Sequence, residues 1–276
     1  MIPANFAYER AESADGAVKL LSNHGEDAKL LAGGHSLLPL MKLRLARPSV
    51  LIDISRLADL SYIRNQDDYI AVGALTRHHD VETSELLARE APLLAAAAGQ
   101  IGDPQVRHRG TLGGSLAHGD PASDLPAVAL ALGATLVALG PGGERTIPAT
   151  DFFTGFFTTA LAPDEMLVEV RVPRVEGSGW SFQKFNRRAL DWAIVGVAAV
   201  AGTNGSRAGV ALVNMAPTPV RATAVEQALA DGASAAEAAA HAADGLDPPA
   251  DTNASPEFRR HLAQVLVRRA LEEAGA

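Results

Sequence analysis

Two glycine-rich stretches place hydroxyl and imidazole groups beside backbone that can bind an anion. The first glycine segment is AGGHS at Ala32–Ser36, and the second glycine segment is TLGGS at Thr111–Ser115, about eighty positions later. Glycine adopts positive φ easily, so successive backbone NH groups in such segments can converge on one anion. One segment suits a phosphate, and two suit a pyrophosphate, because it carries more acceptor oxygens than one segment can satisfy.

The familiar nucleotide-binding signatures match neither segment. A Walker loop ends in Gly-Lys-Ser/Thr, and neither segment has that lysine. The G-x-G-x-x-G fingerprint is also missing around Gly33-Gly34. Each segment taken alone is typical of a tight turn, since Gly-Gly is common turn material. On physical grounds the pair therefore has two interpretations, two separate turns or one pyrophosphate site.

Three histidines suggest other chemistry. His35 could attach a cofactor covalently, but we expect a hydrogen-bonding loop residue. His78 and His79 with Asp80 could suggest a metal site. Adjacent residues face different directions, however, and no third ligand is evident. We therefore expect a solvated helix start at these residues and no metal site.

The composition indicates a folded protein whose partners are proteins or small molecules. The chain has 276 residues, 47% of them hydrophobic, and a formal net charge of −8. That acidic balance argues against a nucleic-acid surface, which needs clustered Lys and Arg. Cysteine is absent, which excludes disulfides, thiolate nucleophiles and cysteine-bound iron-sulfur clusters from this chain. Without a signal-peptide pattern or a bilayer-spanning apolar run, we expect a cytoplasmic protein with no integral membrane contact.

Hydrophobic periodicity and turn residues predict an α+β protein whose last third places helices after strands. We expect helices at 13–24 (with Ser13 as the N-cap), 91–100, 123–133, 223–230, 234–243 and 257–274. We expect strands at 27–31, 49–54, 69–77, 134–140, 165–173, 180–188, 193–202 and 208–216. An Asn204-Gly205 turn would join the last two strands. Glycine, serine and proline concentrate at 173–180, where we place a domain boundary.

The two glycine segments in their context resemble a known family. LAGGHSLLPLMKLRLARPSVLIDI at 31–54, followed by DPQVRHRGTLGGSLAHGDPASDLPA at 103–127, is similar to the FAD-binding medium subunit of molybdenum hydroxylases. That group includes aerobic carbon monoxide dehydrogenase and xanthine dehydrogenase. The similarity extends over nearly the whole chain, and the two motifs in this order and spacing are specific.

The resemblance implies an α+β fold in two parts. Residues 1–176 would form a vanillyl-alcohol-oxidase/PCMH-type FAD-binding domain with two α+β subdomains, about 1–55 and 56–176. Residues 177–276 would form a C-terminal α+β domain, a three-stranded antiparallel sheet plus helices.

The resemblance also implies which residues contact a noncovalently bound FAD. The two glycine segments would hold the pyrophosphate, Asp124 would bond the ribityl hydroxyls, and Leu167 would lie near the adenine. Ile101, Lys184 and Trp192 would lie near the isoalloxazine. The full set is Ala32, Gly33, Gly34, His35, Ser36, Ile101, Thr111, Gly113, Gly114, Ser115, Asp124, Leu167, Lys184 and Trp192.

Two positions depart from the family's pattern. Ser115 stands where members often carry Asn; it keeps one hydrogen bond but has a shorter reach. Leu190 stands where many relatives have a glycine before an aromatic residue close to the flavin. Read without the resemblance, Asp124 is an ordinary N-cap, Lys184 an exposed strand lysine and Trp192 a core residue.

The resemblance, together with the missing cysteines, implies a division of labour among subunits. A small subunit would carry 2Fe-2S clusters and a large subunit the molybdenum-pterin cofactor, in a dimer of heterotrimers. FAD here would pass electrons from the iron-sulfur subunit to an external acceptor, and no catalytic acid or base is expected in this chain. The alternatives are a stand-alone FAD-dependent oxidase or reductase of the same fold and a nucleotide-binding regulatory module.

Overall fold

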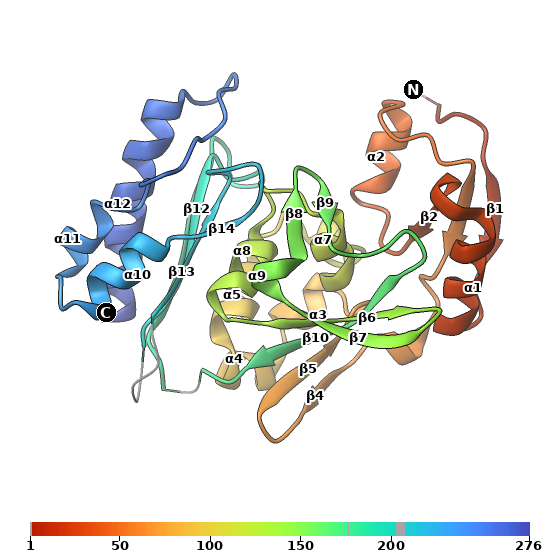
Figure 1. Ribbon diagram of the computed structural model, residues 1–276, viewed down its shortest axis with the longest axis horizontal. Helices are drawn as coiled ribbons and strands as arrows, with labels where there is room; N and C mark the ends of the chain where they lie inside the picture. Colours follow the sequence, from red (N-terminus) through yellow and green to blue (C-terminus); the bar gives the residue numbers. More distant parts are fainter. Residues whose placement is uncertain (1, 176, 203–207) are drawn as a thin grey trace.

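The computed structural model describes residues 2–175, 177–202 and 208–276 (Figure 1). Its strands are β1 (Ala7–Arg10), β2 (Ala28–Leu31), β3 (Val50–Asp53), β4 (Ile63–Asn65), β5 (Tyr69–Gly73), β6 (Thr135–Gly140), β7 (Gly143–Pro148), β8 (Phe153–Gly155), β9 (Thr158–Thr159), β10 (Met166–Pro173), β11 (Trp180–Phe185), β12 (Val195–Val200), β13 (Gly209–Val213) and β14 (Val220–Arg221). Its helices are α1 (Ala14–His24), α2 (Leu37–Lys42), α3 (His78–Glu82), α4 (Glu85–Glu90), α5 (Pro92–Gly99), α6 (Pro104–Arg107), α7 (Leu112–His118), α8 (Asp124–Ala131), α9 (Ala149–Phe152), α10 (Thr223–Ala230), α11 (Ala235–Ala239) and α12 (Pro256–Ala274), with short 3₁₀ turns η1 (Gly25–Asp27) and η2 (Ala58–Leu60).

The first sheet is small and parallel, with strand order β1-β3-β2. Helix α1 packs on it, and the expected cap at Ser13 is confirmed because its hydroxyl accepts a hydrogen bond from Gly16 N at 3.0 Å. The core under this sheet also includes Val137, Met166 and Val168 of the second sheet. Those shared apolar contacts hold the N-terminal part of the chain against the middle.

The second sheet is antiparallel, with strand order β4-β5-β10-β6-β7. Helices α5 and α8 pack together and contribute much of its core, and nearly every residue of α8 is buried. A helix that is apolar on all sides must be covered on all sides. Figure 1 shows what covers these helices: α5 and α8 lie between the second sheet and the third.

The third sheet has strand order β11-β12-β13-β14 and is covered on both faces. Along β12, Val195 and Val197 face the core built with α10, α11 and α12, whereas Ala198 and Val200 face the core built with α5 and α8. Alternate side chains of a strand point to opposite faces. The run that reads as continuously apolar is therefore a strand buried on both sides.

The C-terminal sheet has four strands, where three were expected. The two-residue strand β14 pairs with β13 through Leu212↔Val220 and Ala211↔Arg221. Two residues are too few to show the alternation that predicts a strand. The other strands of this sheet are confirmed, and the expected Asn204-Gly205 turn lies outside the described residues.

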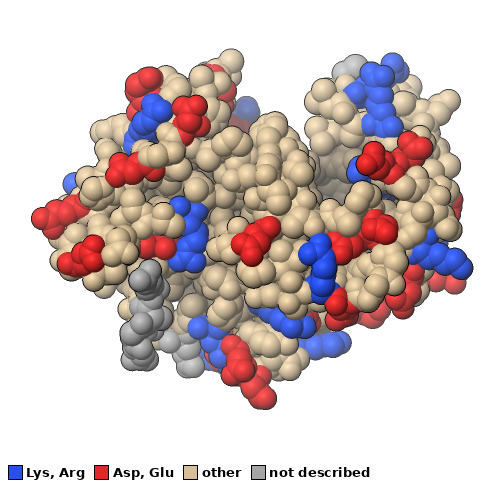
Figure 2. All heavy atoms as spheres, viewed as in Figure 1, with Lys and Arg blue, Asp and Glu red and all other residues tan. Residues whose placement is uncertain are grey.

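The surface carries mixed charges. In the view of Figure 2, acidic and basic side chains are interspersed and form no continuous basic area. A notch in the same view separates the lobe that carries α2 from the hairpin of β8 and β9. Within the described residues, no helix is long and apolar enough to span a bilayer.

Gly209 on β13 provides a test of how closely α8 packs on the third sheet. A Cβ at this position would lie 2.0 Å from the carbonyl oxygen of Ala131, the last residue of α8. We expect Gly209→Ala to lower the free energy of unfolding by about 1–3 kcal/mol, measured by urea denaturation, because the helix must shift. Gly142→Ala is the control, since nothing lies within 4 Å of its Cβ position. Equal stabilities of the two variants would contradict this packing.

Candidate functional site

One pocket brings together segments from the first, second and third sheets and from the two-stranded β8–β9 sheet. Its volume is about 790 Å³, within the range of about 300–1,000 Å³ that is typical of small-molecule sites. The lining includes both glycine segments, α8, β11, the loop after β11 and the β8–β9 hairpin. The residues predicted from the sequence all line it, namely Ala32, Gly33, Gly34, His35, Ser36, Ile101, Thr111, Gly113, Gly114, Ser115, Asp124, Leu167, Lys184 and Trp192.

The first glycine segment connects β2 to α2 and so follows the carboxyl end of a strand, as expected. In the structure that strand pairs in parallel with β3. A carbonyl of this segment accepts a hydrogen bond from the first turn of α2, because Leu38 N donates to Gly34 O at 3.1 Å. Across the described part of the chain, the NH groups of residues 33–37 donate to no protein acceptor. Free NH groups at a helix start are suited to an anionic ligand.

The backbone of the first segment lies against the two residues that precede the second segment. A Cβ on Gly33 would lie 2.2 Å from the carbonyl oxygen of Arg109 and 3.0 Å from the Cα of Gly110, just before the second segment. No side chain fits there, so only glycine permits this approach. Two neighbouring segments were expected from the pattern of glycines, and the structure places Gly33 directly against the residues that lead into the second segment.

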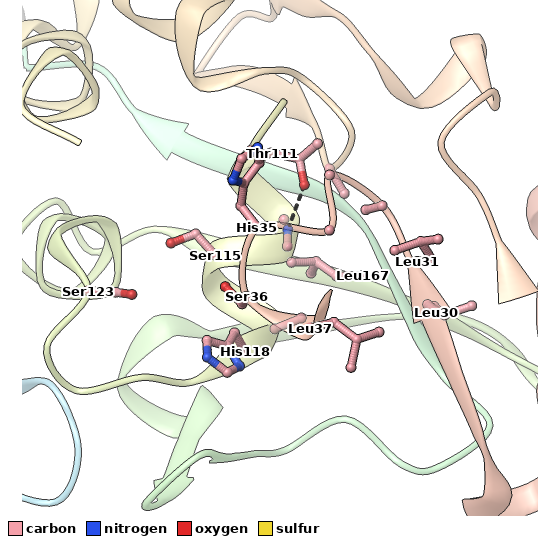
Figure 3. Close-up of a pocket in the computed structure, with 18 of the residues that line it drawn as sticks. Leu30, Leu31, His35, Ser36, Leu37, Thr111, Ser115, His118, Ser123 and Leu167 are labelled. Atoms are coloured by element: carbon pink, nitrogen blue, oxygen red, sulfur yellow. Dashed lines mark hydrogen bonds between the residues drawn. The ribbon is translucent and has the colours of Figure 1, made fainter. Parts of the chain in front are cut away.

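The second glycine segment is not the loop that the sequence suggested. It starts helix α7, with Thr111 as N-cap, because the Thr111 hydroxyl accepts a hydrogen bond from Gly114 N at 3.1 Å. The NH groups of residues 112–115 all donate to protein acceptors, either the carbonyls of Ala74, Thr76 and Thr111 or that hydroxyl. This segment therefore offers a ligand its side-chain hydroxyls rather than converging NH groups. Figure 3 shows Ser115 and Ser36, one from each segment, projecting into the pocket with His118.

A buried ion pair forms the polar end of the pocket. The Lys184 ammonium on β11 donates to Asp124 Oδ2 on α8 at 2.6 Å and to the carbonyl of Gln100 at 3.0 Å. Only 5% of the Lys184 side chain and 6% of the Asp124 side chain are exposed. Neither of the simpler interpretations holds, because the helix cap position belongs to Ser123 and the lysine is buried.

The second carboxylate oxygen of Asp124 has no protein partner. Oδ1 is buried and accepts no hydrogen bond among the described residues, which leaves an acceptor available to a ligand in the pocket. Burial raises the pKa of Asp124 to about 6, against the opposing effect of Lys184, and the nearby Asp120 raises it further. The carboxyl is therefore a strong acceptor when ionised, in a setting that resists ionisation.

Apolar and aromatic side chains form the rest of the lining. Ile101 follows α5 and Leu167 lies on β10, and both line the pocket. Trp192 is 60% exposed, so it is a residue of the pocket edge rather than of the core. Leu190, in the same loop, is also largely exposed. An exposed indole face beside a pocket is suited to stacking against a flat ring.

Several lining residues were not among those predicted to contact FAD. Phe157 and His118, whose ring centroids lie 4.9 Å apart, line the pocket from the β8–β9 hairpin and from α7. His78 lines it as well, and the prediction of a solvated helix start was wrong for this residue, because its side chain is buried. Helix α3 does begin at His78. Within the described residues, no group of three His, Cys, Asp or Glu side chains could hold a metal ion.

Comparison with known families and proteins agrees with this geometry. Residues 4–175 match the family described as FAD binding domain in molybdopterin dehydrogenase, and residues 180–274 match the CO dehydrogenase flavoprotein C-terminal domain. The chain is 44% identical to the carbon monoxide dehydrogenase medium chain of Hydrogenophaga pseudoflava, covering 100% of this chain and 99% of that one. It is 42% identical to the 6-hydroxypseudooxynicotine dehydrogenase complex subunit alpha of Paenarthrobacter nicotinovorans, covering 99% and 96%.

Solved structures give the same answer and confirm the expected fold class. The carbon monoxide dehydrogenase of Hydrogenophaga pseudoflava superposes with a TM-score of 0.97 at 44% identity, over 100% of this chain and 99% of that chain. The quinoline 2-oxidoreductase of Pseudomonas putida 86 superposes with a TM-score of 0.91 at 33% identity, over 99% and 98%. The chain therefore belongs to the FAD-binding medium subunits of the carbon monoxide dehydrogenase and xanthine dehydrogenase family of molybdenum hydroxylases.

Proposed function

We propose that this chain is the electron outlet of a heterotrimeric molybdenum hydroxylase. The observation that carries the proposal is a single pocket with a complete set of groups for a flavin dinucleotide, in a chain that has no cysteine. When bound, FAD would take electrons from a 2Fe-2S subunit and deliver them to an external acceptor. The clusters and the molybdenum-pterin cofactor would belong to a small and a large partner subunit, in a dimer of heterotrimers.

The residues of the pocket fit FAD. The free NH groups of the first glycine segment and the hydroxyls of Thr111 and Ser115 would hold the pyrophosphate. The unpartnered Oδ1 of Asp124 would accept a hydrogen bond from a ribityl hydroxyl. Lys184 would act through Asp124 by fixing its position and charge. Binding would be noncovalent, with His35 a loop residue beside the phosphates.

The apolar lining would take the two ring systems. Trp192 and Ile101 would contact the isoalloxazine, and Leu167 would lie near the adenine. Residues 1–176 would form the FAD-binding domain, with subdomains of about 1–55 and 56–176, and residues 177–276 the C-terminal domain that supplies Lys184 and Trp192. We place both at one site because residues of both line the same pocket.

The relatives support a role in electron transfer for this chain, with substrate selection by another subunit. Proteins 35–44% identical to this chain are named as medium chains or subunits of dehydrogenases for carbon monoxide, glyceraldehyde and caffeine. Such different substrates are compatible with one conserved chain only if another subunit recognises them. The final acceptor would take its electrons from the flavin.

The content of the native complex tests this function. We expect affinity purification through this chain to yield a complex that contains about one FAD per chain together with iron and molybdenum, measured by absorbance, released flavin and metal analysis. FAD alone, with turnover of an alcohol by the isolated chain, would instead support the stand-alone oxidase. A colourless protein that releases no flavin would support the regulatory module.

Removing Lys184 tests the buried ion pair. We expect Lys184→Met to lower the free energy of unfolding by about 3–5 kcal/mol, because it leaves a buried carboxylate without a counter-ion. The double variant Asp124→Leu with Lys184→Met should regain most of that stability, since both charges are gone. The double variant should bind FAD roughly ten- to a hundredfold more weakly in fluorescence titrations, because it has lost the charged acceptor of Asp124. FAD binding at wild-type strength by the stable double variant would show that Asp124 does not contact the cofactor.

The pH dependence of stability gives a separate test of Asp124. Its folded pKa of about 6 lies above the ordinary value of 3.8, so the folded chain binds more protons than the unfolded chain between these values. Stability contributed by this group is therefore lost as pH rises through about 4 to 6. In urea denaturation we expect the free energy of unfolding of the wild type, minus that of the double variant, to be smaller at about pH 7.5 than at about pH 4.5. A constant difference would contradict the assigned titration.

A further inference from the structure

His78 occupies the place where the two glycine segments meet. It is the first residue of α3, and only 4% of the residue is exposed. Its backbone NH donates to the carbonyl of Gly110 at 3.0 Å, and its side chain is part of the pocket wall. A buried imidazole in a ligand pocket needs partners for two ring nitrogens.

One edge of the imidazole lies against Gly110, the residue just before the second glycine segment. A Cβ on Gly110 would lie 2.6 Å from His78 Cδ2 and 2.9 Å from His78 Nε2. Gly110 is also the residue whose Cα lies 3.0 Å from the Cβ position of Gly33 in the first segment. The Nε2 edge of His78 is therefore next to the junction of the two segments.

The surroundings of the two ring nitrogens indicate which tautomer His78 adopts. Among the described residues neither nitrogen of His78 has a hydrogen-bond partner, and Nδ1 is completely buried. A buried N–H without an acceptor is rarer and more costly than an unused lone pair. We therefore assign the lone pair to Nδ1 and the proton to Nε2, on the edge that lies beside Gly110.

The surroundings of His78 keep it neutral. Burial lowers its pKa to about 4, and the electrostatic effects of His35, Arg77 and Arg107 lower it further. These groups come from the first glycine segment, from the residue before α3 and from α6. None of them is an acid that would favour an imidazolium, so the ring is a hydrogen-bond donor without charge.

We propose that His78 is an additional binding residue for the dinucleotide, whose neutral Nε2–H donates a hydrogen bond to the pyrophosphate at the junction of the two glycine segments. The proposal rests on the placement of the FAD pyrophosphate given under the proposed function. It adds a side-chain donor at the point where the second segment has used its own NH groups within the protein.

Substitutions at His78 test the proposal by ligand affinity in the full-length chain. We expect His78→Leu to weaken FAD about ten- to a hundredfold, as for a lost hydrogen bond to a charged group. Competition by ADP should weaken by a similar factor, while riboflavin, which has no phosphate, should bind as it does to the wild type. His78→Gln should restore most of the affinity, because its amide can place an N–H near the position of Nε2.

Two controls separate binding from folding. His79→Leu changes the neighbouring imidazole, which is more exposed and is not among the pocket residues, and should leave FAD and ADP affinities unchanged. Equal losses for FAD and riboflavin in His78→Leu would show a structural role and overturn the proposal, while leaving the flavin function intact. A wild-type chain that binds no FAD would overturn the proposed function itself.

The pH dependence of FAD affinity tests the charge state of the His78 imidazole separately. The pKa of His78 is about 4 before the ligand binds. We expect the ring to stay neutral beside the bound pyrophosphate, so the ratio of FAD dissociation constants between His78→Leu and wild type should be the same at about pH 6 and about pH 8. A ratio that falls as pH rises would mean an imidazolium paired with phosphate, and would overturn the neutral donor. Taking the ratio cancels the titration of Asp124, which both proteins share.

Discussion

Much of the pocket depends on one buried ion pair, between Lys184 and Asp124. Two charges withdrawn from water persist only when they neutralise each other and find further hydrogen bonds. Lys184 does both, since its ammonium also donates to the carbonyl of Gln100. These contacts join α5, α8 and β11, so the C-terminal sheet supplies the cation for a carboxylate on a helix of the middle region. The same arrangement leaves the other carboxylate oxygen of Asp124 buried and without a hydrogen-bond partner among the described residues.

A second constraint fixes the other end of the pocket. The backbone of Gly33 lies so close to the carbonyl of Arg109 that no Cβ fits between them. This contact sets the spacing of the two glycine segments more tightly than side-chain packing would allow. The two segments also differ in their hydrogen bonds. Among the described residues the NH groups of the first segment donate to no protein acceptor, whereas the second segment uses its own to start a capped helix. The pocket thus combines backbone donors from one side with hydroxyl donors from the other.

Local patterns explain which parts of this could be predicted. The glycine segments, the cap at Ser13 and the strands with clear alternation are encoded over a few residues, and the structure has them. Strand β14 is too short to carry a pattern. The pairing of Lys184 with Asp124 joins residues sixty positions apart, and periodicity contains no information about such contacts. His78 was misjudged because histidine occurs both buried and exposed, and only the packing of Gly110 against its ring decides between them.

The sequence contains a signal for the capped start of α7, but the two consecutive glycines there argue against a helix. Thr111 precedes Gly114 by three residues, which is the spacing of an N-cap hydroxyl and the NH group it accepts. Two consecutive glycines oppose a helix, since each costs about 1 kcal/mol relative to alanine. The structure accepts that cost where Gly113 must pass close to Ala74, whose carbonyl takes the Gly113 NH at 2.8 Å. Close backbone approach, rather than loop flexibility, is therefore why this segment is rich in glycine, and the same reason applies to Gly33 across the junction.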